Sequence, residues 1–97
     1  MQLKELITAV KEKNLSKDSL EAYRDQMSSL FAEMMMESAD LEKEEALFMD
    51  KENGTIASRK VKWKATQSGQ RLIVLKRYSL ACKELLNSLK SRLYSIY

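Results

Sequence analysis

Few residues in this sequence have side chains suited to chemistry. There is no His, and Cys82 is the only Cys. An imidazole base, a His-containing metal site and a multi-thiolate zinc site are therefore excluded. Gly54 and Gly69 are isolated from other glycines, so no glycine-rich phosphate loop is present. We expect no catalysis, no metal and no cofactor, and we expect Cys82 to be a small residue of the core.

Charge is divided unevenly along the chain. Residues 1–53 contain 7 basic and 13 acidic residues, a net charge of −6, whereas residues 54–97 contain 10 basic residues and one acidic residue, a net charge of +9. The opposite net charges of the two halves indicate that the halves attract each other, that the second half binds an anionic partner, or both. The acidic band at residues 37–45 is typical of a solvated helix face rather than of an acid–base pair or a Mg²⁺ site.

The segment with the clearest binding chemistry is basic and contains the only Trp. It predicts a nucleic-acid site made of Arg59, Lys60, Lys62, Trp63, Lys64 and Arg71. In the helical register, Val61 and Ala65 face the seam, so we expect Trp63 to point away from it into solvent. Cations that follow phosphates and an exposed aromatic ring that stacks on a base are typical of single-strand binding. Three alternatives remain. Trp63 could anchor an interface between subunits, the cations could pair with the acidic helix of the same or a neighbouring chain, or the ligand could be another anion.

Spacing and composition predict an all-α fold. Proline is absent and only two glycines occur, which leaves long helices with few connections. We predict a single helical domain over 1–97, with a short helix at about 3–13, an acidic helix at 17–52, a turn at 53–54 and a basic helix at 55–96. Apolar residues recur every seven positions from Leu20 to Phe48, and in steps of three and four from Val61 to Ile96. The two long helices should therefore form an antiparallel, coiled-coil-like hairpin.

A two-helix hairpin leaves apolar side chains of its last helix uncovered. We therefore expect a homo-oligomer formed through this C-terminal helix. The predicted interface residues are Leu72, Leu75, Tyr78, Leu86, Leu89 and Leu93. The alternative is a monomeric three-helix bundle. A single Cys fits a reducing compartment, and no signal peptide or membrane span is evident, so we expect a cytoplasmic protein without membrane contact, in the host cytoplasm if it is phage-encoded.

The last helix carries a Lys90-Ser91-Arg92 step inside an apolar stretch, Cys82 to Tyr94. With the short helical start and the acidic-then-basic hairpin, this layout resembles small phage-encoded recombination proteins, in particular the UvsY-like recombination mediator family. The resemblance implies a ring-like homo-oligomer that binds single-stranded DNA and helps to load a recombinase onto strands covered by single-strand-binding protein. It also implies that Lys90 and Arg92 belong to the assembly helix and that residues 59–64 face DNA.

Two other functions remain open at this stage. One is a phage anti-defence or inhibitor protein that binds a host protein or sequesters a phosphorylated ligand. The other is a structural assembly component. Fold-level likeness does not decide among them, because function depends on particular sites.

Overall fold

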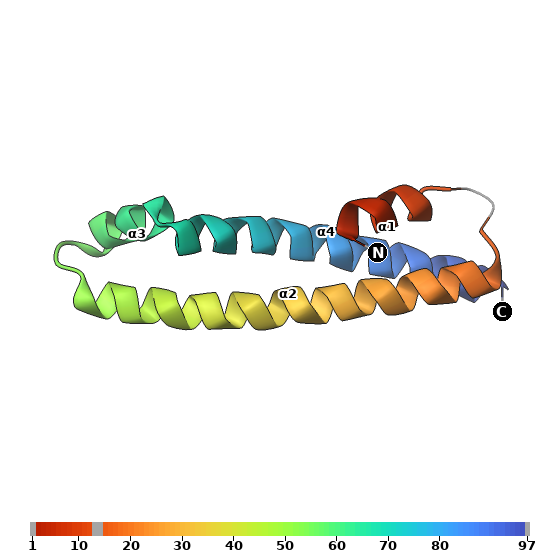
Figure 1. The fold of residues 1–97 in the computed structure, drawn as a ribbon, viewed down its shortest axis with the longest axis horizontal. Coiled ribbons are helices and arrows are strands. Elements are labelled where there is room, and N and C mark those ends of the chain that lie inside the picture. Colours follow the sequence, from red (N-terminus) through yellow and green to blue (C-terminus); the bar gives the residue numbers. More distant parts are fainter. Residues whose placement is uncertain (1, 13–14, 97) are drawn as a thin grey trace.

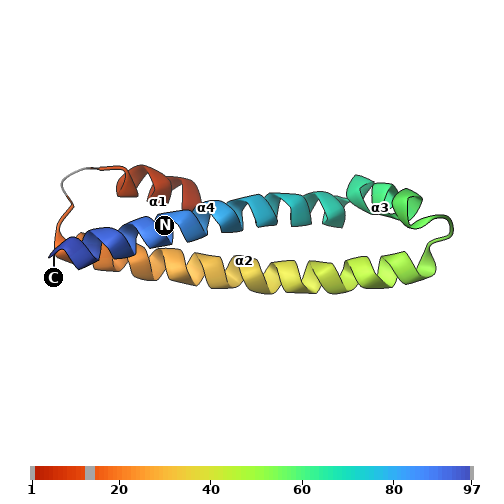
Figure 2. The same cartoon turned by 180° about the vertical axis from the view of Figure 1, so that it is seen from behind.

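The computed structural model describes residues 2–12 and 15–96, and every regular element in them is a helix. The elements are α1 (Leu3–Val10), α2 (Lys17–Lys51), α3 (Ile56–Ala65) and α4 (Gln67–Ile96). The two long helices α2 and α4 lie side by side in opposite directions and form a rod of 56 × 20 × 18 Å (Figure 1). Seen from behind, α3 lies at the turn end of the rod and α1 beside the other half of α4 (Figure 2). The predicted all-α class and helical hairpin are confirmed.

Local capping sets the ends of α2. The Ser16 hydroxyl accepts a hydrogen bond from the backbone N–H of Ser19 at 3.1 Å, which satisfies a donor that the first helical turn leaves free. After Lys51 the chain reverses at Gly54, whose φ of 114° suits glycine and few other residues. The predicted turn at 53–54 is thus confirmed. In contrast, α1 ends at Val10, before the predicted boundary at residue 13, which lies outside the described residues.

The basic helix predicted over 55–96 is two helices, because the chain is extended at Thr66 (φ −74°, ψ 158°). The Thr66 hydroxyl donates to the Trp63 carbonyl oxygen at 2.6 Å and accepts from the Gly69 N–H at 3.0 Å. One side chain therefore closes α3 and caps α4. Thr bonds to backbone groups in this way more readily than most residues, which makes it a good cap and a poor interior residue of a helix.

Gly69 permits the close contact between α3 and α4. A Cβ atom at this position would overlap the backbone carbonyl of Trp63 and would lie 3.1 Å from the Cα of Lys64. Both neighbours are backbone atoms, so no side-chain rotation relieves the overlap. The two helices approach this closely only because residue 69 has no side chain.

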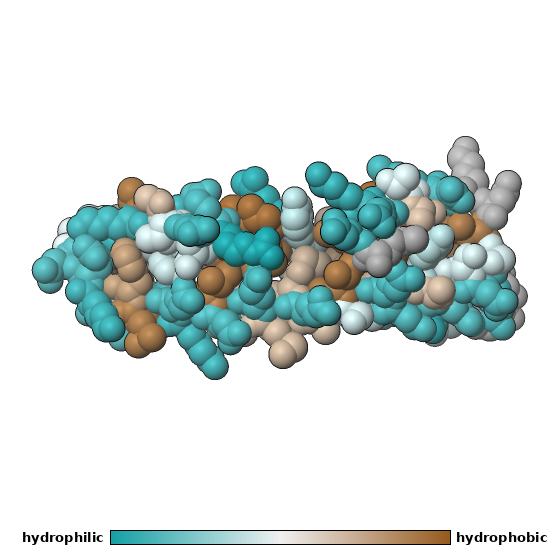
Figure 3. Space-filling model, in the orientation of Figure 1, coloured by the Kyte–Doolittle hydropathy of each residue, from teal (hydrophilic) through white to brown (hydrophobic). Residues whose placement is uncertain are grey.

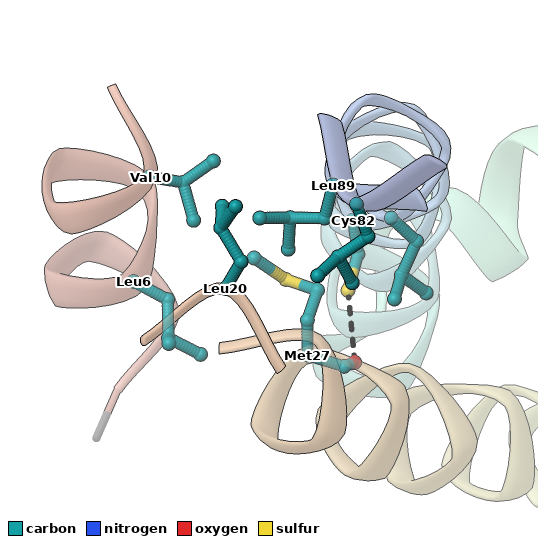
Figure 4. Close-up of a cluster of buried hydrophobic side chains, with 8 residues drawn as sticks. Leu6, Val10, Leu20, Met27, Cys82 and Leu89 are labelled. Carbon is teal, nitrogen blue, oxygen red and sulfur yellow. Dashed lines mark hydrogen bonds between the residues drawn. The ribbon is translucent and has the colours of Figure 1, made fainter. Parts of the chain in front are cut away.

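The core consists of two clusters of buried apolar side chains. The larger cluster joins α1, the first half of α2 and the second half of α4; Figure 4 shows Leu6 and Val10 of α1 directed toward the hairpin. Its buried members are Leu6, Val10, Leu20, Met27, Cys82, Leu86, Leu89 and Leu93. The smaller cluster, at the α3 end, contains Leu41, Trp63, Leu72 and Leu75. Ser38 of α2 and Ser79 of α4 are also buried, at sequence positions between the two clusters on each helix.

Replacement of Gly69 by Ala tests the helix junction. In an ordinary helix interior, Gly→Ala raises stability by roughly 0.5–1 kcal/mol. Here we expect Gly69→Ala to lower the free energy of unfolding by about 1–3 kcal/mol, because the new methyl group must displace backbone. Urea denaturation measures the change, and Gln67→Ala, an exposed position two residues earlier, serves as the control. A stabilised Gly69→Ala variant would contradict the close contact.

Candidate functional site

Trp63 lies inside the protein and is only 5% exposed. Its ring is 5.6 Å from that of Phe48, centroid to centroid, with the ring planes tilted by 53°. The prediction of a solvent-exposed Trp63 is therefore wrong. Val61, which was predicted to face the seam, is 69% exposed. The break at Thr66 explains both errors, because it turns α3 relative to α4 and brings Trp63 against α2 in place of Val61.

Three of the five predicted binding cations contact α2 or the residue that follows it. The Arg59 guanidinium donates to the carbonyl oxygen of Met49 at 2.5 Å, in the last turn of α2, where the helix dipole favours a cation. Lys62 pairs with Glu52 at 3.0 Å. Arg71 pairs with Glu37 at 2.9 Å. The alternative in which the cations complement the acidic helix of the same chain therefore holds for these three residues.

Lys60 and Lys64 differ from the other three cations. Both are exposed on α3, four residues apart, and neither has an ion-pair partner among the described residues. Residues four apart on a helix share a face, so the two ammonium groups are presented together. Exposed Val61 lies beside them. Of the six residues predicted to bind nucleic acid, only this pair forms an accessible cluster with unpaired charge, which we call the tip lysines.

The predicted oligomer interface is mostly interior. Five of its six residues, Leu72, Leu75, Leu86, Leu89 and Leu93, are at most 8% exposed and are covered by helices of their own chain. Tyr78 is the exception, with 45% of its surface exposed. The residues at the seam of the hairpin thus form the intramolecular core. A surface for another chain must involve other side chains.

Such side chains lie on the side of the hairpin away from α1. On α4, the groove beside α1 is lined by Tyr78 and Ala81. Across the seam, Leu80 and Lys83 of α4 line a different hollow together with Phe31 and Met35 of α2. This hollow has a volume of about 420 Å³ and no described residue of α1 lines it. We call the side of the hairpin that carries it the open face.

Two of the residues that line the hollow have hydroxyl groups that are fully buried. They are Ser38 and Ser79, and neither Oγ atom has a hydrogen-bond partner within 2–12 and 15–96. An unpaired buried hydroxyl costs about 1–3 kcal/mol. The rim is charged, with Lys76 and Glu42 3.7 Å apart. The space-filling view in Figure 3 shows apolar groups scattered among hydrophilic side chains along the rod.

Sequence reasoning did not identify Phe31, Met35 or Ser38 as residues of a surface. On α2 the structure buries Ser38 and leaves Glu37 and Glu44 exposed, with Glu37 paired to Arg71. A usable signal was present. Alanines recur every seven residues at positions 32, 39 and 46, beside Met35, and small residues at such spacing form a flat helix face.

Cys82 is buried, as predicted for a small core residue. Its Sγ donates a weak hydrogen bond to the Met27 carbonyl oxygen at 3.4 Å, and burial raises the pKa of its thiol. The thiolate is the reactive form of Cys, so the raised pKa and the burial make Cys82 a poor nucleophile. Among the described residues, no group of three or more His, Cys, Asp or Glu is placed to hold a metal ion.

Burial of the Cys82 thiol predicts how its contribution to the free energy of unfolding changes with pH. Because the folded-state pKa of the thiol is raised, its contribution to stability is fully present below the ordinary value of 9.0 and is lost as the pH rises above it. We expect the difference in unfolding free energy between wild type and Cys82→Ala to shrink from pH 8 to pH 10.5. At pH 7.5 a thiol reagent should react with native protein only as fast as the protein unfolds. Rapid reaction of the folded chain would contradict burial.

Burial of Trp63 predicts the effect of its removal. Trp63→Ala should lower the free energy of unfolding by about 3–5 kcal/mol, since it empties the centre of the smaller cluster. Lys64→Ala, on the exposed side of the same helix, should change it by no more than about 0.5 kcal/mol. Urea unfolding followed by circular dichroism measures both. A Trp63→Ala variant as stable as wild type would mean that the ring lies in solvent.

No helix in the described part of the chain is long and apolar enough to cross a membrane. In the comparisons with known proteins, no family model matches this chain, and neither a curated protein nor a solved structure is significantly similar to it.

Proposed function

We propose that this protein is a non-enzymatic helical accessory protein that binds single-stranded nucleic acid, with the tip lysines of α3 as its main phosphate contacts. The observation that carries the proposal is the charge of α3. This helix has four cations and no acidic residue, and Lys60 and Lys64 are exposed and have no ion-pair partner in the part of the chain that the structure describes. Cations that contact only phosphates bind without reading sequence.

The mode of binding differs from the one expected from the sequence. A buried Trp63 is not available to stack on a base. Attraction is therefore mainly electrostatic, and it depends strongly on salt because phosphate contacts release counterions. Arg59 and Lys62 support this role indirectly, since their contacts with Met49 and Glu52 attach α3 to the end of α2. The resemblance to phage recombination mediators agrees with a single-stranded ligand.

Binding of a labelled 20-nucleotide single strand, followed by fluorescence anisotropy over a salt series, tests the proposal. We expect log affinity to fall linearly with log salt, with a slope of about −0.7 for each phosphate neutralised. The double variant Lys60→Gln/Lys64→Gln should bind roughly tenfold more weakly at low salt, with a slope reduced by about 1.4. Trp63 emission should change little on binding.

The matched control is Lys11→Gln/Lys43→Gln, which removes the same charge from exposed positions away from α3. It should keep most of the affinity. Equal weakening by both double variants would show that only net charge matters and would refute a site at the tip. Tighter binding of a duplex than of a single strand of equal length would refute the preference for single strands.

A structural assembly role is a second candidate. The open face supports it, because Met35 and Leu80 are 49% and 63% exposed where they line the hollow. If this role is correct, the protein forms a stable oligomer. Neither of the two double variants then changes its binding to nucleic acid.

A further inference from the structure

The open face has the composition of a helix-packing surface. Phe31, Met35 and Leu80 form its apolar part. Next to Met35 on α2, Ala32 and Ala39 are exposed and project little, which lets another helix approach at the short end of the usual 8–10 Å separation. Ser38 and Ser79 also line the hollow, and their small side chains leave space there for side chains of another helix.

The open face is also large enough for a stable protein interface, and its hollow lies near the middle of the rod. One long side of the rod measures 56 by 20 Å, or roughly 1,100 Å², against about 800 Å² per partner in a typical stable interface. The hollow spans residues 31–42 of α2 and 76–83 of α4, which lie near the middle of both helices. A rod of the same length centred on the hollow therefore covers the whole side.

The net charges of the two long helices indicate which helical partner fits the open face. Helix α2 has four basic and ten acidic residues, a net charge of −6, and α4 has six basic residues and one acidic residue, a net charge of +5. A second copy of this chain offers both an acidic and a basic helix on a face of the same shape. Its direction is then decided by which helices become neighbours.

Two copies facing each other can point in the same or in opposite directions. In opposite directions α2 lies on α2 and α4 on α4, which places like charges together. In the same direction α2 of each copy lies on α4 of the other, and all neighbouring helices are antiparallel, as in the hairpin itself.

We propose that the open face binds a second copy of this chain pointing in the same direction, so that α2 of each copy packs on α4 of the other in a four-helix bundle. The two α3 helices then lie at the same end. The interface is independent of the tip lysines, and it differs from the seam leucines of α4 that the sequence indicated.

Substitutions on the open face test the surface. At 100 µM, light scattering should give twice the 11.2 kDa of one chain. Met35→Lys and Leu80→Lys should each raise the dimer dissociation constant about thirtyfold or more and leave the helical circular dichroism signal unchanged, because both side chains are exposed in the single chain. The control is Met36→Lys, a neighbour that is 71% exposed and does not line the hollow. A wild-type mass of 11.2 kDa, or equal dissociation by Met35→Lys and Met36→Lys, would overturn the proposal.

A distance measurement tests the direction. Ala57→Cys places one reactive thiol on the exposed surface of α3, while Cys82 is buried. Spin labels there should lie roughly 10–30 Å apart in the same-direction dimer, the span of adjacent helices. A separation close to the 56 Å length of the rod would show opposite directions and would overturn the proposed pairing. Neither result alters the test of the tip lysines, which uses other residues and another measurement.

Discussion

The packing of α2 against α4 is the interaction on which the rest of this structure depends. α1 and α3 are both attached to it, α1 through Leu6 and Val10 near one end and α3 through Trp63 near the other. A pair of helices encloses the side chains between them and leaves both broad sides of the pair open. α1 has only eight residues and lies beside a small part of the rod (Figure 1), and none of its described residues lines the hollow across the seam. The open face follows from the number and length of the helices.

Where a helix is uninterrupted, the spacing of its residues predicted the packing correctly. Leu20, Met27 and Leu41 of α2 are buried, as are Leu72 and Leu93 of α4. The prediction failed at Thr66, because apolar or small residues continue at helical spacing through positions 61, 65 and 68 although the helix does not. Helix propensity changes little at one Thr. The hydroxyl contacts that make it a cap reach only three residues in either direction, but an isolated Thr within continuous helical spacing does not reveal them in the sequence.

The candidate site shows a similar limit. The sequence located the basic segment but did not show which cations remain free, because this depends on what lies opposite each of them. Arg59 reaches the end of α2, and Arg71 reaches Glu37, which is 34 residues away in sequence. Exposed ion pairs of this kind contribute little stability, typically below about 1 kcal/mol. They nevertheless neutralise charge that a simple count assigns to a ligand. Lys60 and Lys64 lie on the exposed side of α3, and no ion pair among the described residues neutralises their charge.

The unequal sizes of the two core clusters have a consequence for motion. Ser38 and Ser79 lie in sequence between an eight-residue apolar cluster and a four-residue one, and the half-buried Met34 packs against both clusters. Proteins open locally in cooperative units, and units with fewer buried contacts open at lower free energy. The end that holds α3 has fewer buried apolar side chains, so we expect it to open at a lower free energy than the end that holds α1.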